Sequence, residues 1–467
     1  MFDLRLLPGE PLVKFNRQLP VFNWVYPLSR ESDLIEDRSL PYRNWTERAA
    51  RRRAVYIHIP FCQTICTFCP FQRERYKGPA ELNEYVEALL REFVLKNQYI
   101  GRPRVEAIFI GGGTPSLLTP EQFRMIGDAI NKYLDTVPQF EFSVECEVKS
   151  VTPDKLQAMR EIGVNRVSFG VQTLLPEYRA PFSLDASKEQ ITRAAGLINE
   201  TFPYTNVDLM YGFAGQGFEQ VMHDLNDIVR LQTTTIDAYP INNLSIHRSL
   251  HRAFAQSRLG LLPATNRQSY RIGINQYLRD RGYVAINGYS YAKAGDSSCR
   301  TGSVLQHSPK FLYHDMLYGY EDDEIIGYGS SASSRIANSN LFNFSNRRAY
   351  VKEILTEKSL PHMACAPTPA EERGIVTFPY RGVLEKERIT WEAVPSETLT
   401  ALHDAVTAGL IHDSVDKYEV SELGWLFYVN LMYFLMPEVG KRWISDNIDI
   451  QQRQGRNYED TLLVNSV

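Results

Sequence analysis

Three cysteines stand within eight residues of one another in the stretch YIHIPFCQTICTFCPFQ, residues 56–72. Cys62, Cys66 and Cys69 follow a Cys-x3-Cys-x2-Cys spacing. A zinc site would need a fourth ligand, and no second Cys/His pair is visible, since Cys299 and Cys365 stand alone and the nine histidines are dispersed. Three thiolates on one short loop suit a cubane iron–sulfur cluster in which one iron keeps an open coordination position. The spacing therefore predicts a cluster whose open iron binds a further molecule directly.

Two other stretches carry residues suited to ligand binding. GGGTPS (111–116) lacks side chains at three consecutive positions, so backbone can approach a ligand closely; the alternative is a tight turn between a strand and a helix. Glu145 lies in VECEV, where strand alternation puts Val144 and Cys146 on the opposite face. A carboxylate inside a barrel is costly unless a polar ligand meets it, and the alternative is a local salt bridge.

Six short apolar runs rich in β-branched residues alternate with helical patterns and are expected to position these residues. Helix starts are marked by TPEQ (119–122) and TPDK (152–155), each with a Thr N-cap followed by Pro. Repeated strand–helix units predict an α/β fold with parallel strands, and a partial (β/α)6 TIM-like barrel is favoured over an open doubly wound sheet. The expected strands are residues 55–59, 105–113, 141–146, 166–172, 206–213 and 234–241.

We expect the chain to consist of three parts: an N-terminal extension (1–54), a core barrel with its substrate-side extension (55–335), and a C-terminal unit (336–467). The last part has a helix with Leu399, Leu402, Val406 and Leu410 on one face, then a short KYEVS strand and another helix. That order resembles a winged helix. Acidic residues are not outnumbered by basic residues in it, so packing or substrate covering is favoured over DNA binding.

Composition narrows the class of protein. The chain has 467 residues, 43% hydrophobic and 23% charged, with a net charge of -4, which is typical of a globular protein and gives no reason to expect nucleic-acid binding. No secretory signal or transmembrane run is visible, and the apolar run 425–436 is interpreted as a buried helix, with an interfacial helix as the alternative. Few and scattered remaining cysteines favour reduced thiols and a cytoplasmic location.

The motifs YIHIPFC, FIGGGTPS, RVSFGVQT, DLMYGF and IIGYGSSA resemble, in this order, the oxygen-independent coproporphyrinogen III oxidase branch of the radical S-adenosylmethionine (SAM) enzymes. The resemblance covers roughly residues 55–335, and the C-terminal unit is also similar. It implies a [4Fe-4S] cluster held by the three clustered cysteines and SAM bound to the open iron. One electron then cleaves SAM and generates a 5'-deoxyadenosyl radical.

The resemblance also implies which residues bind SAM. Cysteines 62, 66 and 69, with Tyr56, are the expected catalytic residues, and the segment IIGYGSS (325–331) is expected to close a backbone edge around SAM. C-terminal strand ends are where barrel active sites collect. The expected SAM contacts are Tyr56, Phe68, Gly112, Gly113, Thr114, Glu145, Gln172 and Asp208.

Two positions depart from the pattern of the oxidases. They carry a fourth cysteine two residues after the third, where this chain has Phe71. They also carry an arginine about a dozen residues after the position of Gln172, where this chain has Leu184, and Arg179 is the nearest replacement. These departures favour the C-methyltransferases of the same branch, which resemble the oxidase and bind one or two SAM molecules.

Three functions follow from the resemblance. The first is methylation of an sp2 carbon in a flat unsaturated molecule such as a quinone, a heteroaromatic compound or a tetrapyrrole. Aromatics of 289–295 and 311–323 are candidates to line that site, and the alternative is that they are ordinary surface and core residues. The second is oxidative decarboxylation of coproporphyrinogen III. The third is a haem chaperone, for which His247 and His251, four residues apart, are the best ligand candidates.

The expected partners are a small-molecule substrate and a reducing protein such as flavodoxin or ferredoxin. No nucleic acid or transmembrane segment is expected, although a quinone substrate would require peripheral contact with a membrane. An open iron site predicts sensitivity to oxygen. The acceptor, the electron donor and the oligomeric state have no motif in the sequence.

Overall fold

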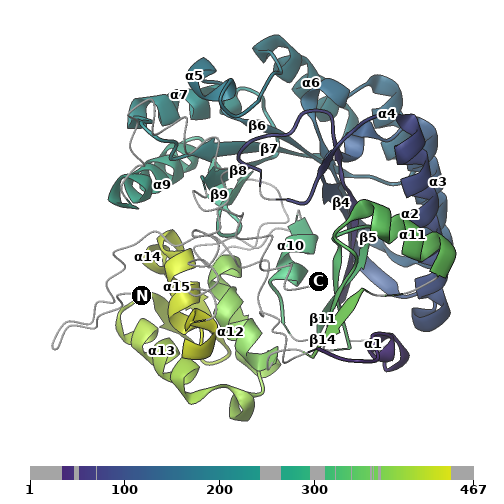
Figure 1. The fold of residues 1–467 in the computed structure, drawn as a ribbon. Coiled ribbons are helices and arrows are strands. Elements are labelled where there is room, and N and C mark those ends of the chain that lie inside the picture. The colour runs from purple at the N-terminus through teal and green to yellow at the C-terminus, as the bar shows by residue number, and fades with distance from the viewer. Residues whose placement is uncertain are drawn as a thin grey trace.

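The computed structural model describes residues 34–46, 52–69, 71–241, 264–294, 311–320, 322–337, 339–357, 360, 362–366 and 370–442. A curved sheet of parallel strands forms the centre, and helices cover its outer face (Figure 1). All six expected strands are present, which confirms the α/β fold. Their bounds are β1 (Arg52–Ile59), β4 (Arg104–Gly112), β5 (Asp135–Cys146), β6 (Arg166–Gln172), β7 (Tyr204–Tyr211) and β8 (Thr235–Pro240).

The sheet continues beyond these six strands on both sides. A seventh parallel strand, β11, pairs with β1, and antiparallel strands extend each edge in the order β14-β13-β12-β11-β1-β4-β5-β6-β7-β8-β10-β9. The two outermost strands, β14 and β9, do not pair with each other, so the barrel is partial. The added strands are β9 (Tyr283–Ala285), β10 (Ser290–Lys293), β11 (Asp323–Tyr328), β12 (Ser333–Ile336), β13 (Ser339–Phe342) and β14 (Met363–Cys365).

The crossover helices begin where the sequence predicts. Thr119 caps its helix by accepting a hydrogen bond from the backbone N–H of Gln122, and the Gln122 side chain accepts one from Thr119 in return. Thr152 also precedes a helix, but its hydroxyl donates to the Asp154 carboxylate instead. The helices around the barrel are α2 (Pro79–Ile100), α3 (Pro120–Tyr133), α4 (Pro153–Glu161), α6 (Lys188–Thr201), α7 (Phe218–Val229) and α9 (Ala264–Arg279).

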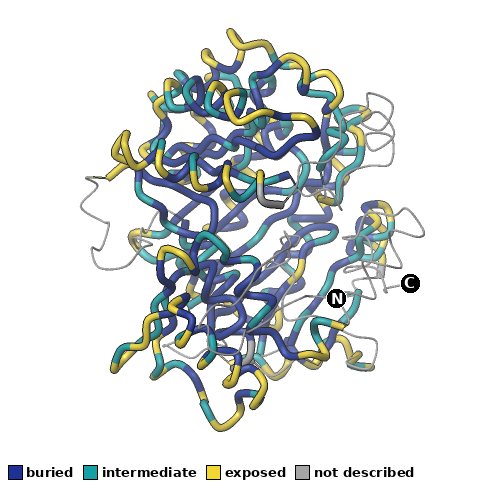
Figure 2. Tube along the Cα trace, turned by 90° about the vertical axis from the view of Figure 1, so that its left-hand side faces the viewer, coloured by how far each residue is buried: buried dark blue, intermediate teal, exposed yellow. Residues whose placement is uncertain are grey.

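Burial follows this layout. The strands of the barrel are buried along most of their length, while the outer helices alternate between buried and exposed positions (Figure 2). This pattern is expected for parallel strands whose outer face is covered by amphipathic helices. The inward face of the barrel is different, because several of its buried residues are polar or charged, as described below.

The C-terminal unit lies apart from the barrel strands, with the short helix α10 (Leu312–Leu317) between them (Figure 1). Its run 425–436 is buried, as predicted, and a break at Phe427 divides it into two helices. No helix within the described residues combines the length and apolar character needed to cross a membrane. The unit contains α12 (Ala370–Arg381), β15 (Val383–Glu385), α13 (Ser396–Thr407), β16 (Ile411–Asp413), β17 (Lys417–Val420), α14 (Glu422–Leu426) and α15 (Tyr428–Leu435).

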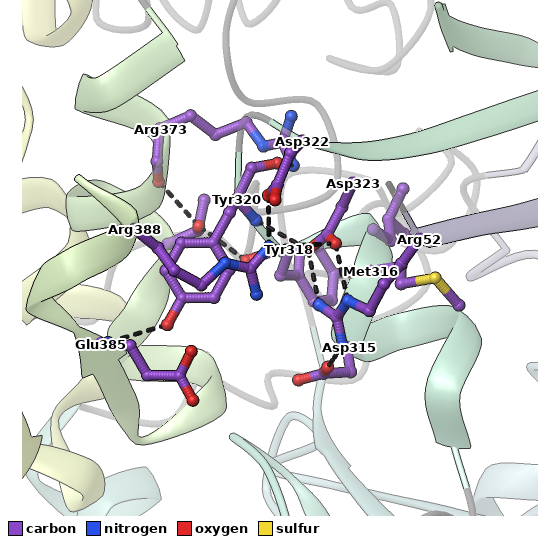
Figure 3. A network of polar contacts seen from close by, with 12 residues as sticks. Arg52, Asp315, Met316, Tyr318, Tyr320, Asp322, Asp323, Arg373, Glu385 and Arg388 are labelled. Atoms are coloured by element: carbon purple, nitrogen blue, oxygen red, sulfur yellow. Dashed lines mark hydrogen bonds and ion pairs between the residues drawn. The ribbon is translucent and has the colours of Figure 1, made fainter. Parts of the chain in front are cut away.

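A network of ion pairs ties this unit to the barrel (Figure 3). Arg52, at the start of β1, donates two hydrogen bonds to Asp323 (2.7 and 2.6 Å) and one to Asp315 of α10 (2.8 Å). Arg388 of the C-terminal unit contacts Asp322 and lies 3.4 Å from Asp323. The Asp323 side chain is fully buried, so these arginines supply the charge that its carboxylate needs.

The N-terminal segment also packs on the barrel. Leu34 forms a β-bridge with Cys365 of β14, and the ring nitrogen of Trp45 donates to Glu324 at 3.0 Å. The short helix α1 (Leu40–Arg43) buries Tyr42. Of the first 54 residues, those that the structure describes therefore make specific contacts with the sheet, while the three-part division of the chain stays a prediction.

Candidate active site

The clustered cysteines lie on a loop that leaves the carboxyl end of β1. Its two ends pair as short parallel strands, β2 (Phe61–Cys62) and β3 (Glu74–Arg75). The N–H of Tyr76 donates to the carbonyl of Cys62 at 2.8 Å, which closes the base of the loop. Since eleven intervening residues are held at both ends, the loop is fixed over the mouth of the barrel.

The thiols of this loop suit a metal cluster. None forms a disulfide, and burial raises the pKa of Cys66 to about 11 and that of Cys69 to about 12. Arg73 opposes this effect by its charge, and the part of the chain that the structure describes offers no hydrogen-bond acceptor to its buried Nε. A cation beside three cysteines stabilises thiolates, which are the form that binds iron.

The described residues contain no group of three or more His, Cys, Asp and Glu side chains arranged to hold one metal ion. The thiolates of a cubane bind three different iron atoms, so they need not converge on a single point. Phe71, at the position of the oxidases' fourth cysteine, is exposed.

Tyr56 is connected to the cysteine loop through His58, a residue that the sequence analysis missed. His58 Nε2 lies 3.0 Å from the carbonyl of Gln72, and a carbonyl accepts, so Nε2 carries the proton. Nδ1 therefore accepts from the Tyr56 hydroxyl at 2.9 Å. Burial lowers the pKa of His58 to about 4, which keeps the imidazole neutral and this arrangement intact. The sequence did contain a signal for His58, because a residue two positions after Tyr56 on the same strand points to the same face.

The three consecutive glycines make room for the protein itself. A Cβ on Gly111 would lie 2.8 Å from Glu145, and one on Gly112 would lie 2.6 Å from the His58 ring. A Cβ on Gly113 would lie 2.7 Å from the carbonyl oxygen of Phe61, at the base of the cysteine loop. The glycines thus let strand β4 lie against both the loop and the neighbouring strand, and direct contact with SAM stays a prediction.

Glu145 points into the barrel, as strand alternation predicts. It accepts a hydrogen bond from the backbone N–H of Gly112 at 3.1 Å. Burial raises its pKa to about 7, against the opposing effects of that N–H and of the charge on Arg166. A carboxyl with this pKa ionises readily when a cationic or hydroxyl-bearing ligand arrives. Thr114, which follows the glycines, is buried beside Cys62.

Gln172 is held in a left-handed conformation with φ of 67° at the end of β6. The pairing of β6 with β7 shifts register between Gly170 and Gln172, so a β-bulge turns this side chain out of the strand's alternation. Non-glycine residues with this φ are uncommon and cluster at functional sites. The bulge supports Gln172 as a site residue, although its predicted SAM contact is not tested.

Leu184, at the position where the oxidases carry an arginine, packs in an apolar cluster beside the cysteine loop. Phe68 and Leu184 are both partly buried there, and the ring of Phe68 lies 5.4 Å from that of Phe182. Arg179 does not turn towards this cluster. Its guanidinium donates instead to the backbone carbonyls of Thr173 (2.6 Å), Val171 and Ala186, which fixes the loop after β6.

A group of buried or half-buried charged residues lies on the inward face of the barrel, and we call Glu145, Arg166, Asp208 and Asp237 the inner polar cluster. Asp208 and Asp237 are direct neighbours on β7 and β8, so their side chains share a face. Asp208 accepts hydrogen bonds from Asn206 (2.8 Å) and Ser168 (3.4 Å). Burial and the adjacent carboxylate raise the pKa of Asp208 well above its usual range.

Sequence reasoning missed Arg166 and Asp237. Each is a single charged residue in a strand pattern that is otherwise mainly apolar, which was the available signal. Both are almost completely buried, at 1% and 2% exposure. Their proximity to Asp208 depends on strand order and register, which a single sequence does not specify.

Aromatic residues from four segments line the barrel beside this cluster. Tyr239 stands on β8, and its ring centroid lies 4.3 Å from that of Tyr289, which precedes β10. His314 of α10 has its Nδ1 3.3 Å from the Tyr289 hydroxyl and 3.0 Å from that of Tyr380, on α12. The segments 289–295 and 311–323 therefore supply aromatic side chains here, and the C-terminal unit adds Tyr380.

The segment 325–331 is fixed by a buried acid on α2. Glu92 accepts hydrogen bonds from the N–H of Gly329 (2.7 Å) and the hydroxyl of Tyr350 (2.7 Å), and pairs with Lys96 at 2.7 Å. This network holds the backbone after β11 against β1. His247, His251 and Cys299 lie outside the described residues.

Residues 56–228 match the Radical SAM superfamily. The haem chaperone HemW of Bacillus subtilis is 26% identical over 386 residues, 80% of this chain and 96% of the chaperone. The oxygen-independent coproporphyrinogen III oxidase of Bradyrhizobium diazoefficiens is 26% identical over 359 residues, 75% of this chain and 76% of that protein. The solved structure of coproporphyrinogen III oxidase (HemN) from Escherichia coli, a radical SAM enzyme, has a TM-score of 0.72 at 20% identity, covering 88% of this chain and 94% of that chain. At this identity the structural likeness shows a shared fold.

Proposed function

Residues 56–228 are a radical SAM domain in a chain with the fold of HemN, and from this premise we propose that the protein oxidises a tetrapyrrole by hydrogen-atom abstraction. A radical SAM domain implies a [4Fe-4S] cluster and SAM. The cluster, when bound, supplies the electron that cleaves SAM to methionine and a 5'-deoxyadenosyl radical. The carboxyl of Glu145, which accepts the Gly112 N–H and whose pKa burial raises to about 7, is the observation that carries the proposal.

The chain's own residues have the following proposed roles. Cys62, Cys66 and Cys69 hold the cluster, and Arg73 offsets their negative charge. His58 orients the Tyr56 hydroxyl and fixes the end of the loop at Gln72. Glycines 112 and 113 with Thr114 present backbone and hydroxyl groups to SAM, while Glu145, Gln172 and Asp208 bind its polar groups. Phe68 excludes water from the cluster.

Oxidative decarboxylation fits the comparisons better than the methyl transfer favoured by the sequence, because the oxidase relative aligns over three quarters of both chains. Held by these residues, the cluster and SAM would supply the group that takes one hydrogen atom from a propionate side chain of the substrate. Loss of CO2 and of one electron to an external one-electron acceptor then leaves a vinyl group. Flavodoxin or ferredoxin is the proposed electron donor to the cluster.

A haem chaperone is the second candidate. The HemW relative aligns over 96% of its length, and this chain has Phe71 where the oxidases carry their fourth cysteine. A chaperone of this kind would bind haem without turning over a porphyrinogen. The two functions share the cysteine loop and differ in whether the radical reaches a substrate carbon.

Product analysis tests the proposal. Anaerobically reconstituted protein with reductant, SAM and coproporphyrinogen III is expected to release 5'-deoxyadenosine and CO2 without S-adenosylhomocysteine. Release of both nucleosides would instead establish methyl transfer. Stoichiometric haem binding with neither nucleoside would establish the chaperone. Cys66→Ala is the control, and it is expected to lose the cluster absorbance together with all nucleoside products.

A further inference from the structure

Two oppositely charged side chains of the inner polar cluster keep bonding capacity that the protein leaves unused. Asp237 Oδ2 accepts a hydrogen bond from the Tyr239 hydroxyl at 3.0 Å. Nothing among the described residues donates to Oδ1, although Asp237 is only 2% exposed. The hydroxyl of Ser290, its neighbour on β10, is buried and close enough to lower the pKa of the Asp237 carboxyl, yet it makes no hydrogen bond of normal geometry in the described part of the chain.

Arg166, which is positively charged, also has hydrogen-bonding groups without a partner among the described residues. Its guanidinium carbon lies 3.9 Å above the ring of Phe311, and the side chain is 1% exposed. The described residues provide no acceptor for its Nε or Nη1. Each buried polar group without a partner costs about 1–3 kcal/mol, so a site that keeps several of them is expected to bind a ligand that satisfies them.

The surroundings limit what that ligand is. In the proposed function SAM engages Glu145 and Asp208, which leaves Asp237 Oδ1 and Arg166 for the other reactant. Asp237 accepts hydrogen bonds and Arg166 donates them, so the reactant carries both N–H groups and an acidic group. The rings of Tyr239 and Tyr289, 4.3 Å apart, provide an aromatic surface directly beside Asp237. Flat heterocycles pack favourably on such a surface.

We propose that Asp237 accepts hydrogen bonds from the pyrrole N–H groups of the substrate and that Arg166 binds one of its carboxylates. The inference rests on the proposed tetrapyrrole function and deepens it by naming the groups that recognise the substrate. The zwitterionic end of a second SAM molecule offers an ammonium and a carboxylate to the same two residues, so the experiment compares porphyrin binding with SAM binding.

Binding of coproporphyrin III tests the role of Asp237. This stable porphyrin keeps two of the four pyrrole N–H groups of coproporphyrinogen III and all four carboxylates, and its fluorescence reports binding to the anaerobic, cluster-loaded protein. Asp237→Asn is nearly isosteric and replaces one acceptor oxygen by a donor. It is expected to weaken porphyrin binding at least about tenfold, whereas the dissociation constant of SAM changes less than about threefold.

The tetramethyl ester of the same porphyrin isolates the role of Arg166. Arg166→Gln is expected to weaken binding of the free acid about tenfold and leave binding of the ester unchanged, because the ester has no carboxylate. Asp237→Asn is expected to weaken both porphyrins equally. Asp227→Asn, which changes a buried carboxylate on α7 paired with Lys188, is the matched control and should leave every affinity unchanged.

The outcomes separate the two proposals. Wild-type protein that binds neither porphyrin overturns the proposed function and the inference with it. Wild-type binding that Asp237→Asn does not weaken overturns the inference alone. Loss of SAM affinity in both variants, with porphyrin affinity kept, assigns the two residues to a second SAM molecule and also overturns it. Circular dichroism of each variant checks that it is folded.

Discussion

Glu145 illustrates how one residue joins the structure of the site to its chemistry. The sequence predicts its direction from strand alternation, and the structure adds its partner, the N–H of Gly112 at 3.1 Å. Burial in the barrel raises its pKa to about 7, because it outweighs the Gly112 N–H and the charge on Arg166, which both lower the pKa. The carboxyl group is therefore half ionised at a pH where the ligand is expected to bind.

This pKa gives a pH dependence for SAM binding. Below pH 7 Glu145 is mainly protonated and accepts hydrogen bonds poorly, so SAM binding should strengthen about tenfold between pH 6 and pH 8. Titration of the cluster-loaded protein with SAM, followed by absorbance, measures the effect. Glu145→Gln should bind weakly with no pH dependence, and a pH profile unchanged in this variant would contradict the assignment.

Gly112 allows a second prediction at the scale of one residue. Its φ is +109°, and a Cβ would lie 2.6 Å from His58. Gly112→Ala should displace His58, release its contacts with Tyr56 and Gln72, and lower the iron content after reconstitution. Gly196→Ala in α6 is the control, since a Cβ there meets nothing within 4 Å. It should raise the free energy of unfolding by about 0.5–1 kcal/mol.

At the scale of elements, the end of β6 shows how a strand is adapted to present a side chain. A regular strand would aim Gln172 by simple alternation, but the bulge between Gly170 and Gln172 changes its direction. The left-handed φ of 67° at Gln172 is the cost of that change. Neither feature has a sequence signal here, because the usual glycine is absent from the left-handed position.

Comparison of Gly and Ala at position 172 tests this conformation. In an ordinary strand Gly is less stable than Ala, whereas in a left-handed position Gly is more stable. Gln172→Gly should therefore exceed Gln172→Ala in free energy of unfolding by about 1 kcal/mol, measured with urea. Both variants should bind SAM more weakly than the wild type. The opposite order of stability would rule out the bulge.

At the scale of the whole molecule, the C-terminal unit completes the site that the barrel begins. Tyr380 of α12 reaches His314 at 3.0 Å, so the aromatic wall depends on how this unit is docked. The contact between Arg388 and Asp322, and the pairing of Arg52 with Asp323 and Asp315, hold that docking from the other side (Figure 3). A change in this network is expected to affect both stability and substrate binding.

Asp323→Asn tests the network. Removing one charge from a buried pair leaves Arg52 without its main partner, which should lower the free energy of unfolding by about 3–5 kcal/mol in a urea titration. Asp413→Asn breaks the exposed pair with Lys386 and should change stability by less than about 1 kcal/mol. Equal effects of the two substitutions would show that the buried pair does not carry the docking.

Asp323 also predicts how the free energy of unfolding falls at low pH. Burial raises the pKa of Asp323, but hydrogen bonds and charge from Arg52 outweigh it and keep the pKa below the usual range of an aspartate. A lowered pKa stabilises the fold above the unfolded value and loses that contribution as pH falls through the folded value. The wild type should therefore lose stability below pH 4 more steeply than Asp323→Asn.

The sequence by itself determined the repeating units and the loop chemistry. Strand and helix patterns are local, so the six parallel strands, the Thr119 cap and the buried run 425–436 could be predicted from neighbouring residues. The cysteine spacing is equally local, and it indicated the superfamily that residues 56–228 match. Motif similarity also indicated Glu145 and Asp208, which lie on the inward face of the barrel.

Only the tertiary structure decided which residues face one another across strands. Asp237 and Arg166 stand 71 positions apart in the sequence, and strand order and register bring both to the inward face near Asp208. The contact of Tyr380 with His314 likewise depends on docking of a separate unit. Register and docking are set by the summed packing of many side chains, a non-local quantity that no short motif encodes.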